Sequence, residues 1–286
     1  MNINELIKKG IRTISQTYPE MEARGMVLAY LCHTLGIQRH THIIEPLYEV
    51  PSDRMDEIMA AIERMAAGEP LQYVIGEASF YGRAFHVTPS VLIPRPETEL
   101  LCRFALDSSA DMKNALDLCT GSGCIAWTIA LERPGVEVTA VDISDEALEV
   151  ASSQDFVEEI SNTGAIAPSF MKADVLADEL LPDQKFDLLL SNPPYVMDKE
   201  KALMRTNVLD HEPHLALFVP DDDPLKFYRA IADKAPCLLA ERGVGIVEIN
   251  EALGQETAAL FTSAGFTDVR VENDLNDRPR FVIFRR

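Results

Sequence analysis

The sequence has few cysteines: five in 286 residues, with no two of them spaced as a CxxC pair. This scarcity excludes a disulfide framework or a zinc ribbon and favours reduced thiols. The sequence also has no apolar run of about 18 residues without a charge, and its first residues lack the apolar stretch of a signal peptide. We therefore expect a cytoplasmic protein that does not bind membranes. His211 and His214 are spaced like metal ligands, but third and fourth ligands are missing, so we expect no metal.

Basic residues are also scarce. The chain has 26 lysines and arginines against 46 aspartates and glutamates, which gives a formal net charge of -20. A field of this sign repels a phosphate backbone rather than steering it inward. Nucleic acid is therefore not the expected partner.

The length favours a main domain of about 170 to 200 residues and a smaller second domain. Apolar residues recur at three- and four-residue spacing through residues 1–68, which predicts a small helical domain. Its last helix is expected to begin at Pro51 and to end at Gly68. Residues 69–99 carry aromatic and β-branched residues broken by glycine and proline, which predicts a β-hairpin linker.

Strands alternate with helices through the remaining domain, residues 100–286. Such alternation is typical of βαβ units and predicts an α/β fold with a mostly parallel, seven-stranded, Rossmann-like sheet. A loop too short for a crossover helix joins the last two strands, so we expect an antiparallel pair at the sheet edge. The expected strands are 115–118, 136–141, 169–172, 186–190, 245–249, 268–271 and 281–284.

A glycine-rich loop, TGSG at residues 120–123, joins a buried strand to a helix. A doubly wound fold presents backbone amides to a ligand at this place, and glycine lets the ligand approach the main chain. Asp142 ends the next strand, where a carboxylate binds the hydroxyls of an adenosine ribose. Asp174 follows the strand after that and is placed to accept a hydrogen bond from an adenine amine. The loop also satisfies the dinucleotide fingerprint, so these residues alone do not decide the cofactor.

Asn192, Pro193, Pro194 and Tyr195 directly follow the fourth expected strand, at the sheet edge that carries the glycine loop. An amide nitrogen is a poor nucleophile because its lone pair is delocalised, so a site that methylates it must orient the NH2 group. Asn192 supplies a neutral acceptor for one N–H, and the main-chain carbonyl of Pro193 can accept the other. Tyr195 can pack on the planar amide. The segment therefore predicts methyl transfer to a planar nitrogen without a metal.

Together these motifs resemble the release factor glutamine N5-methyltransferases, the HemK/PrmC-type family. The resemblance covers nearly the whole chain, and the combination of PRPETE with SNPPY is specific to this group. The matching segments are PLQYVIGEASFYG at 70–82, VLIPRPETE at 91–99, DLCTGSGCIA at 117–126, AVDIS at 140–144, FDLLLSNPPY at 186–195, HEPHLALF at 211–218 and FYRAIA at 227–232.

The resemblance implies a class I methyltransferase that uses S-adenosylmethionine and methylates the glutamine in the GGQ motif of peptide chain release factors. The helical domain would help to dock the release factor. The family commonly has glycine in place of Cys119 and can have an aromatic residue in place of Val175. The cofactor would contact Cys119, Thr120, Gly121, Ser122, Gly123, Asp142, Asp174, Val175 and Asn192. The glutamine would lie against Asn192, Pro193, Pro194 and Tyr195, with Arg95 and Glu99 beside the site.

Other functions fit parts of the pattern. An adenine-N6 methyltransferase acting on DNA or RNA also uses NPPY, since an exocyclic amine poses nearly the same problem as an amide. The acidic charge and the PRPETE segment argue against it. A non-catalytic, partner-binding module is a second alternative, against which the intact Asn192 and glycine loop argue. An NAD-dependent enzyme is the weakest rival, because nothing near NPPY offers hydride chemistry.

Overall fold

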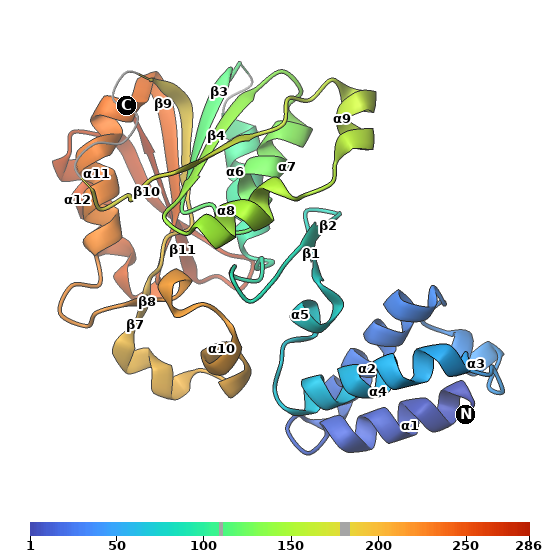
Figure 1. Cartoon of the computed structure of the whole chain (residues 1–286). Helices are drawn as coiled ribbons and strands as arrows, with labels where there is room; N and C mark the ends of the chain where they lie inside the picture. The colour runs from blue at the N-terminus through green and yellow to red at the C-terminus, as the bar shows by residue number, and fades with distance from the viewer. Residues whose placement is uncertain (109–110, 178–183) are drawn as a thin grey trace. The chain divides into compact units, whose positions relative to one another are not determined.

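The computed structural model describes residues 1–108, 111–177 and 184–286, which form two compact units (Figure 1). The helical unit comprises Met1–Glu77 and Met204–His211. The sheet unit comprises Ala78–Leu203 and Glu212–Arg286. The chain therefore leaves the sheet unit once, after NPPY, to add a short segment to the helical unit.

The helical unit buries the apolar faces of its helices against one another. A capping box starts the first helix: Glu5 N donates to the Asn2 side chain at 3.0 Å, and Asn2 N donates to the Glu5 carboxylate at 3.1 Å. Ile58, Ile62 and Met65 are buried, which confirms the apolar stripe predicted for the last helix of residues 1–68. The helices are α1 (Ile3–Ile14), α2 (Glu20–Leu35), α3 (Thr41–Ile44), α4 (Met55–Ala66), α5 (Leu71–Ile75) and α10 (Thr206–His211), with the 3-10 turn η1 (Ser52–Arg54).

The segment around α10 joins this unit from a distant part of the sequence. The Arg205 guanidinium lies 2.8 Å from the Glu22 carboxylate on α2. Both side chains are well exposed, so this ion pair contributes little to stability. The pair nevertheless lies within the helical unit, to which Met204–His211 belongs.

The sheet unit is built on one mixed sheet. Among the described residues, seven strands lie in the order β10-β11-β9-β6-β3-β4-β5. The strands from β9 to β5 run parallel, and β11 runs antiparallel to both β9 and β10. This confirms the predicted Rossmann-like fold and its antiparallel pair. The strands are β3 (Asn114–Leu118), β4 (Glu137–Asp142), β5 (Ser169–Lys172), β6 (Phe186–Ser191), β9 (Leu239–Glu248), β10 (Thr267–Asn273) and β11 (Pro279–Arg285).

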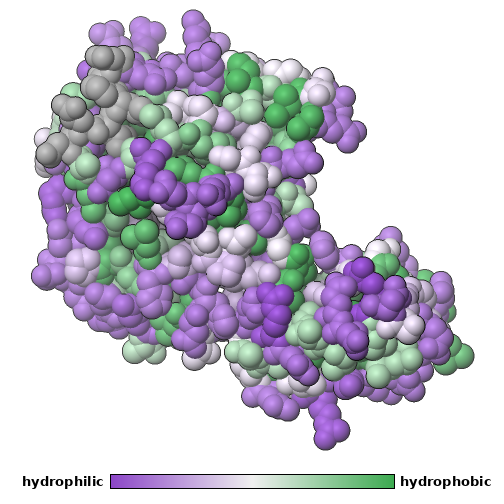
Figure 2. Space-filling model, viewed as in Figure 1, coloured by the Kyte–Doolittle hydropathy of each residue, from purple (hydrophilic) through white to green (hydrophobic). Residues whose placement is uncertain are grey.

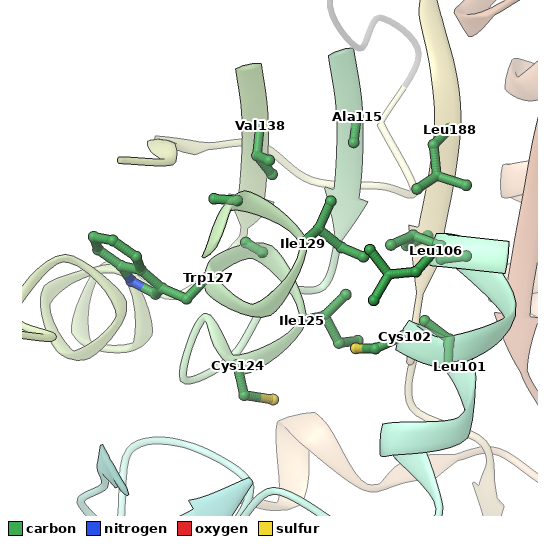
Figure 3. Close-up of a cluster of buried hydrophobic side chains, with 14 of the residues drawn as sticks. Leu101, Cys102, Leu106, Ala115, Cys124, Ile125, Trp127, Ile129, Val138 and Leu188 are labelled. Atoms are coloured by element: carbon green, nitrogen blue, oxygen red, sulfur yellow. The ribbon is translucent and has the colours of Figure 1, made fainter. Parts of the chain in front are cut away.

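Helices cover both faces of this sheet because successive strand residues point to opposite sides. Ala115 of β3 packs in the cluster that contains α6 and α7, whereas Leu116 packs in the cluster that contains α11 and α12. Figure 3 shows the first cluster, where Ile125 of α7 lies beside Cys102 of α6. The helices are α6 (Thr98–Ser108), α7 (Cys124–Glu132), α8 (Asp145–Ser152), α9 (Val157–Thr163), α11 (Lys226–Leu238) and α12 (Gly254–Ser263). Shorter elements are η2 (Asp198–Leu203), η3 (His214–Ala216), η4 (Glu251–Leu253) and the paired strands β7 (Val196–Met197) and β8 (Phe218–Val219).

The hairpin predicted within residues 69–99 is present but shorter, as β1 (Glu77–Phe80) and β2 (Arg83–His86). Phe80 and Phe85 are fully buried in the α6–α7 cluster, so the hairpin packs with the sheet unit. Arg83 strengthens this attachment through ion pairs with Glu132 of α7 and Glu159 of α9. The residues just before the hairpin form α5, which packs with the helical core.

Among the described residues, no helix has the length and apolar character needed to cross a membrane. The face shown in Figure 2 is largely hydrophilic, with smaller hydrophobic areas between the polar ones. Scattered exposed apolar residues are ordinary on a protein surface.

The packing between β9 and β11 can be tested at Gly245. A Cβ atom at this position would lie 2.0 Å from Cζ of Phe284, whose ring stacks on Phe261 with centroids 3.9 Å apart. Because the ring is held on its other side, it cannot move away freely. We expect Gly245→Ala to lower the free energy of unfolding, measured in urea, by about 1–3 kcal/mol.

Gly25→Ala on α2 is the matched control. A Cβ atom there would meet no heavy atom of the described residues within 4 Å. Alanine is more favourable than glycine inside a helix by roughly 0.5–1 kcal/mol, so this variant should be at least as stable as the wild type. Wild-type stability of Gly245→Ala would contradict the packing described.

Candidate active site

A cavity of about 480 Å³ lies at the carboxyl ends of β3, β4, β5 and β6. Open α/β sheets bind ligands at this edge, and small-molecule sites typically enclose about 300–1,000 Å³. Of the residues predicted for the site, ten line this cavity: Arg95, Cys119, Thr120, Gly121, Ser122, Asp142, Asp174, Val175, Asn192 and Pro194. The other four predicted residues, Gly123, Pro193, Tyr195 and Glu99, are not among its lining residues.

The two glycines of the loop have different surroundings. Gly121 has a φ of 56°, and a Cβ atom there would meet no heavy atom of the described residues within 4 Å, so its backbone is open towards the cavity. Gly123 has a φ of 79° and caps α7, and a Cβ atom there would lie 3.1 Å from both Ala151 and Trp127. Gly121 thus allows close approach of a ligand, whereas Gly123 allows close packing of the helix.

Asp142 is fixed by the main chain at the end of β4. Its carboxylate accepts hydrogen bonds from Gly121 N at 2.9 Å and from Ser144 N at 3.0 Å. Burial raises the pKa of this carboxyl group, and the two amide donors oppose the rise. Each carboxylate oxygen keeps a second lone pair. Asp142 can therefore accept further hydrogen bonds from a ligand in the cavity while its orientation stays fixed.

Asp174 and Val175 line the cavity beyond the end of β5. The Asp174 carboxylate accepts a hydrogen bond from Leu176 N at 2.8 Å, which orients the side chain. Val175 is buried, and the exposed Ile143 and Leu176 also line this part of the cavity. A carboxylate beside apolar side chains suits a flat ring that carries an amino group.

Cys119 adopts a φ of 60°, in the left-handed region that favours glycine. This conformation gives a physical reason for the glycine that the related family commonly has at the position. Burial, together with the negative charges of Asp142 and Asp117, raises the pKa of the Cys119 thiol. The thiol is therefore protonated at neutral pH and is a poor nucleophile.

The NPPY segment is anchored on both sides. The Ser191 hydroxyl donates to Leu118 O on β3 at 2.8 Å, and Asn250 Nδ2 donates to Tyr195 O at 3.2 Å. The Tyr195 hydroxyl donates to the carboxylate of Glu248 at 2.9 Å. Burial and the Glu248 charge raise the pKa of Tyr195, which keeps this hydroxyl protonated. The segment therefore has little freedom to change its course.

Asn192 lies where two cavities meet. It lines the large cavity and also a small one of about 40 Å³. Tyr195 and Arg95 line the small cavity as well. Pro193, which follows Asn192 in the sequence, is buried. The geometry thus brings Asn192, Tyr195 and Arg95 together, next to the space bounded by the glycine loop and Asp142.

Arg95 and Glu99 have different surroundings. The Arg95 guanidinium lies 2.7 Å from the buried carboxylate of Glu212, which also accepts a hydrogen bond from Ile93 N at 3.3 Å. Glu99 instead accepts a hydrogen bond from Tyr81 N at 2.9 Å, in the turn of the hairpin. The structure therefore brings Arg95 to the site, while Glu99 fastens the hairpin.

Family models match two segments of the chain: residues 5–76 match the PrmC N-terminal domain, and residues 97–215 match the Methyltransferase small domain. A release factor glutamine methyltransferase of Bacteroides thetaiotaomicron is 37% identical over 96% of this chain and 97% of its own. One of Chlorobaculum tepidum is 37% identical over 98% of this chain and 95% of its own. The chain belongs to the release factor glutamine methyltransferase family. The resemblance inferred from the motifs is thus confirmed.

One more distant solved structure is similar to this chain in its fold alone. The catalytic domain of hMettl16, solved in complex with the MAT2A 3'UTR hairpin 6, is 14% identical, with a TM-score of 0.55. The match covers 78% of this chain and 81% of that one. This match shows that the two chains share a fold.

Sequence analysis missed three residues in or next to the candidate site: Thr98, Glu212 and Glu248. Each is almost completely buried, with 2%, 4% and 1% of its surface exposed. Glu248 carried a usable signal, because a lone charged residue ends the apolar stretch GVGIVE at the carboxyl edge of the sheet. Thr98 and Glu212 lie in two segments that match the family, but their partners lie far away in the sequence, so their roles could not be inferred.

Asp117, just before the glycine loop, is buried and accepts a hydrogen bond from the Thr120 hydroxyl at 2.6 Å. Burial raises its pKa to about 7. The folded protein therefore holds a proton that the unfolded chain has lost above about pH 4. The contribution of Asp117 to stability therefore falls as pH rises from about 4 to about 7, because the folded state binds more protons than the unfolded chain in this range.

We expect the stability of Asp117→Asn relative to the wild type to rise progressively between about pH 4 and about pH 7, by up to a few kcal/mol. Urea unfolding at several pH values measures this difference. Asp233→Asn, at an exposed position on α11, removes the same charge and serves as the control. If the stability difference between Asp117→Asn and the wild type stayed constant with pH, the raised pKa of Asp117 would be contradicted.

Proposed function

We propose that this protein transfers a methyl group from S-adenosylmethionine to the side-chain amide nitrogen of the glutamine in the GGQ motif of peptide chain release factors. S-adenosylhomocysteine is the second product. The two relatives at 37% identity are release factor glutamine methyltransferases. The observation that carries the proposal is the place of Asn192, which lines both a cofactor-sized cavity and a small neighbouring one.

The residues of the large cavity fit the cofactor. The open backbone at Gly121 and the carboxylate of Asp142 suit its ribose, and Asp174 with Val175 suits its adenine. Cys119, Thr120 and Ser122 complete the wall beside them. When bound, S-adenosylmethionine supplies an electrophilic methyl group on a positively charged sulfur. The Asp142 carboxylate is held by two main-chain donors, so it needs no rearrangement to accept ribose hydroxyls.

The NPPY residues would hold the glutamine. Asn192 Oδ1 accepts one N–H of the substrate amide and the Pro193 carbonyl accepts the other, which leaves the nitrogen lone pair facing the cofactor cavity. Tyr195 and Pro194 confine the planar amide between them. Because these residues are anchored before the substrate arrives, the site needs little rearrangement during the reaction.

The proposal assigns a role to each part of the chain. Residues 1–68 dock the release factor, residues 69–99 link the domains, and residues 100–286 carry out catalysis. Arg95 belongs to the substrate side of the site, whereas Glu99, predicted beside it, supports the site from the hairpin. The cytoplasmic location expected from the sequence is part of the same proposal, and the free state of all five cysteines supports it.

Mass spectrometry of the GGQ peptide tests the function directly. Purified release factor is incubated with the protein and S-adenosylmethionine, and we expect one added methyl group on the glutamine side chain. A release factor whose GGQ glutamine is replaced by alanine is the control and should stay unmodified. An unmodified wild-type factor, or a methyl group on another residue, would overturn the proposal.

Asn192→Ala tests the catalytic role of the amide. Removing one oriented acceptor typically lowers the rate by about 10²-fold or more. We expect methyl transfer to fall by this amount, while cofactor affinity measured by calorimetry stays within about tenfold. Asn162→Ala, at an exposed position on α9, is the matched control and should behave like the wild type. Normal turnover of Asn192→Ala would show that the assigned role is wrong.

Asp142→Ala tests the cofactor site. Hydrogen bonds to a charged group contribute about 1.5–3 kcal/mol each, so we expect cofactor affinity to fall by about 10- to 100-fold. The maximal rate at saturating cofactor should fall less, because Asp142 does not contact the substrate amide. Saturation kinetics with calorimetry separates the two effects. A larger loss in maximal rate than in affinity would rule out this assignment.

A further inference from the structure

A buried carboxylate lies behind the NPPY segment. Glu248, the last residue of β9, accepts a hydrogen bond from the Thr98 hydroxyl at 2.6 Å and from the Tyr195 hydroxyl at 2.9 Å. Thr98 is the first residue of α6 and in turn receives a hydrogen bond from Asn192 Nδ2 at 3.3 Å. Thr98 therefore connects Glu248 to the candidate catalytic amide, although the three residues lie far apart in the sequence.

The chemistry of these groups gives the chain of hydrogen bonds a single direction. An ionised carboxylate only accepts, so Thr98 must give its one proton to Glu248. The Thr98 oxygen can then only accept, and the group that faces it must be a donor. Of the two ends of the Asn192 amide, only the NH2 end is a donor. The Asn192 oxygen is therefore the end left for the substrate.

This direction matters because the two ends of an asparagine amide have nearly the same shape. Rotation by half a turn would present N–H groups to the NH2 group of a substrate, and two donors would then face each other. An unsatisfied donor in a buried site costs about 1–3 kcal/mol. Shape alone cannot prevent this rotation, whereas a partner that only accepts can.

We propose that Glu248 and Thr98 are positioning residues, which fix the amide of Asn192 with its oxygen towards the substrate. The site is thereby set to receive a nitrogen that carries hydrogen atoms, such as a primary carboxamide, and to reject an acceptor in the same place. This inference rests on the proposed function and adds to it the residues that determine the polarity of the substrate site.

The direction depends on the charge of Glu248. Burial raises the pKa of its carboxyl group, and the hydroxyls of Thr98 and Tyr195 oppose the rise. Once protonated, Glu248 has an O–H of its own to donate, and Thr98 is released to donate to Asn192. Turnover should therefore fall as pH drops through this raised pKa. The titratable groups that interact with the carboxyl include Arg280 on β11, Glu97 before α6, Cys102 on α6, Cys124 on α7, Tyr195 after β6 and Tyr228 on α11. The Tyr228 hydroxyl donates to Glu248 O.

The test compares two changes at Thr98. Thr98→Val keeps the shape of the side chain and removes the hydroxyl, whereas Thr98→Ser keeps the hydroxyl. Thr257→Val on α12 is the matched control, because Thr257 is fully buried and its Oγ1 has no partner among the described residues. Methyl transfer to purified release factor is measured for each, and calorimetric binding of S-adenosylhomocysteine checks that each variant is folded.

We expect Thr98→Val to lower kcat by about 10- to 100-fold, with KM for the release factor and cofactor affinity changed by less than about threefold. Thr98→Ser and Thr257→Val should stay within about threefold of the wild type. In an Asn192→Ala background, Thr98→Val should lower kcat by less than about a further twofold, because the amide that it orients is gone. Glu248→Gln should lower kcat and remove the acid limb of its pH profile.

Two results would overturn the inference. One is full activity of Thr98→Val. The other is an equal loss of kcat in the wild-type and Asn192→Ala backgrounds, which would show that Thr98 contributes only to structure. A folded wild-type protein that transfers no methyl group to the release factor would instead overturn the proposed function, and this inference with it.

Discussion

The parallel order of β4, β3, β6 and β9 is the constraint on which the whole site depends. Parallel strands end at the same edge of a sheet, so residues that follow different strands are brought together there. Asp142 comes from β4, the glycine loop from β3, Asn192 from β6 and Glu248 from β9. The sheet thus assembles a binding cavity and the candidate catalytic amide from segments that span more than a third of the chain.

Polar groups that are buried or half-buried then set the geometry of this edge. Asp142 is held by two main-chain amides, and Glu248 is held by two hydroxyls. Both carboxylates lose hydration, and both regain hydrogen bonds that set the orientation of their neighbours. The protein therefore uses its buried charges less for stability than for directing hydrogen bonds at the site.

Much of this arrangement could be predicted from the sequence. Alternating apolar strands and helices predicted the sheet, and the loop and Asp142 could be placed because their position depends on strand ends alone. The pairing of Thr98 with Glu248 could not, because the two residues are 150 positions apart and only the packing of α6 on β9 unites them. The surroundings of Gly123 were equally hidden, since a glycine that admits a ligand and one that admits a helix look alike in sequence.

A crystal structure of the protein with S-adenosylhomocysteine and a GGQ peptide would test the central claim most directly. The account predicts that Asn192 Oδ1 lies within about 3.2 Å of the glutamine amide nitrogen, while Asn192 Nδ2 stays on the Thr98 hydroxyl. A glutamine bound away from Asn192, or an Asn192 side chain turned with its NH2 group towards the substrate, would contradict it.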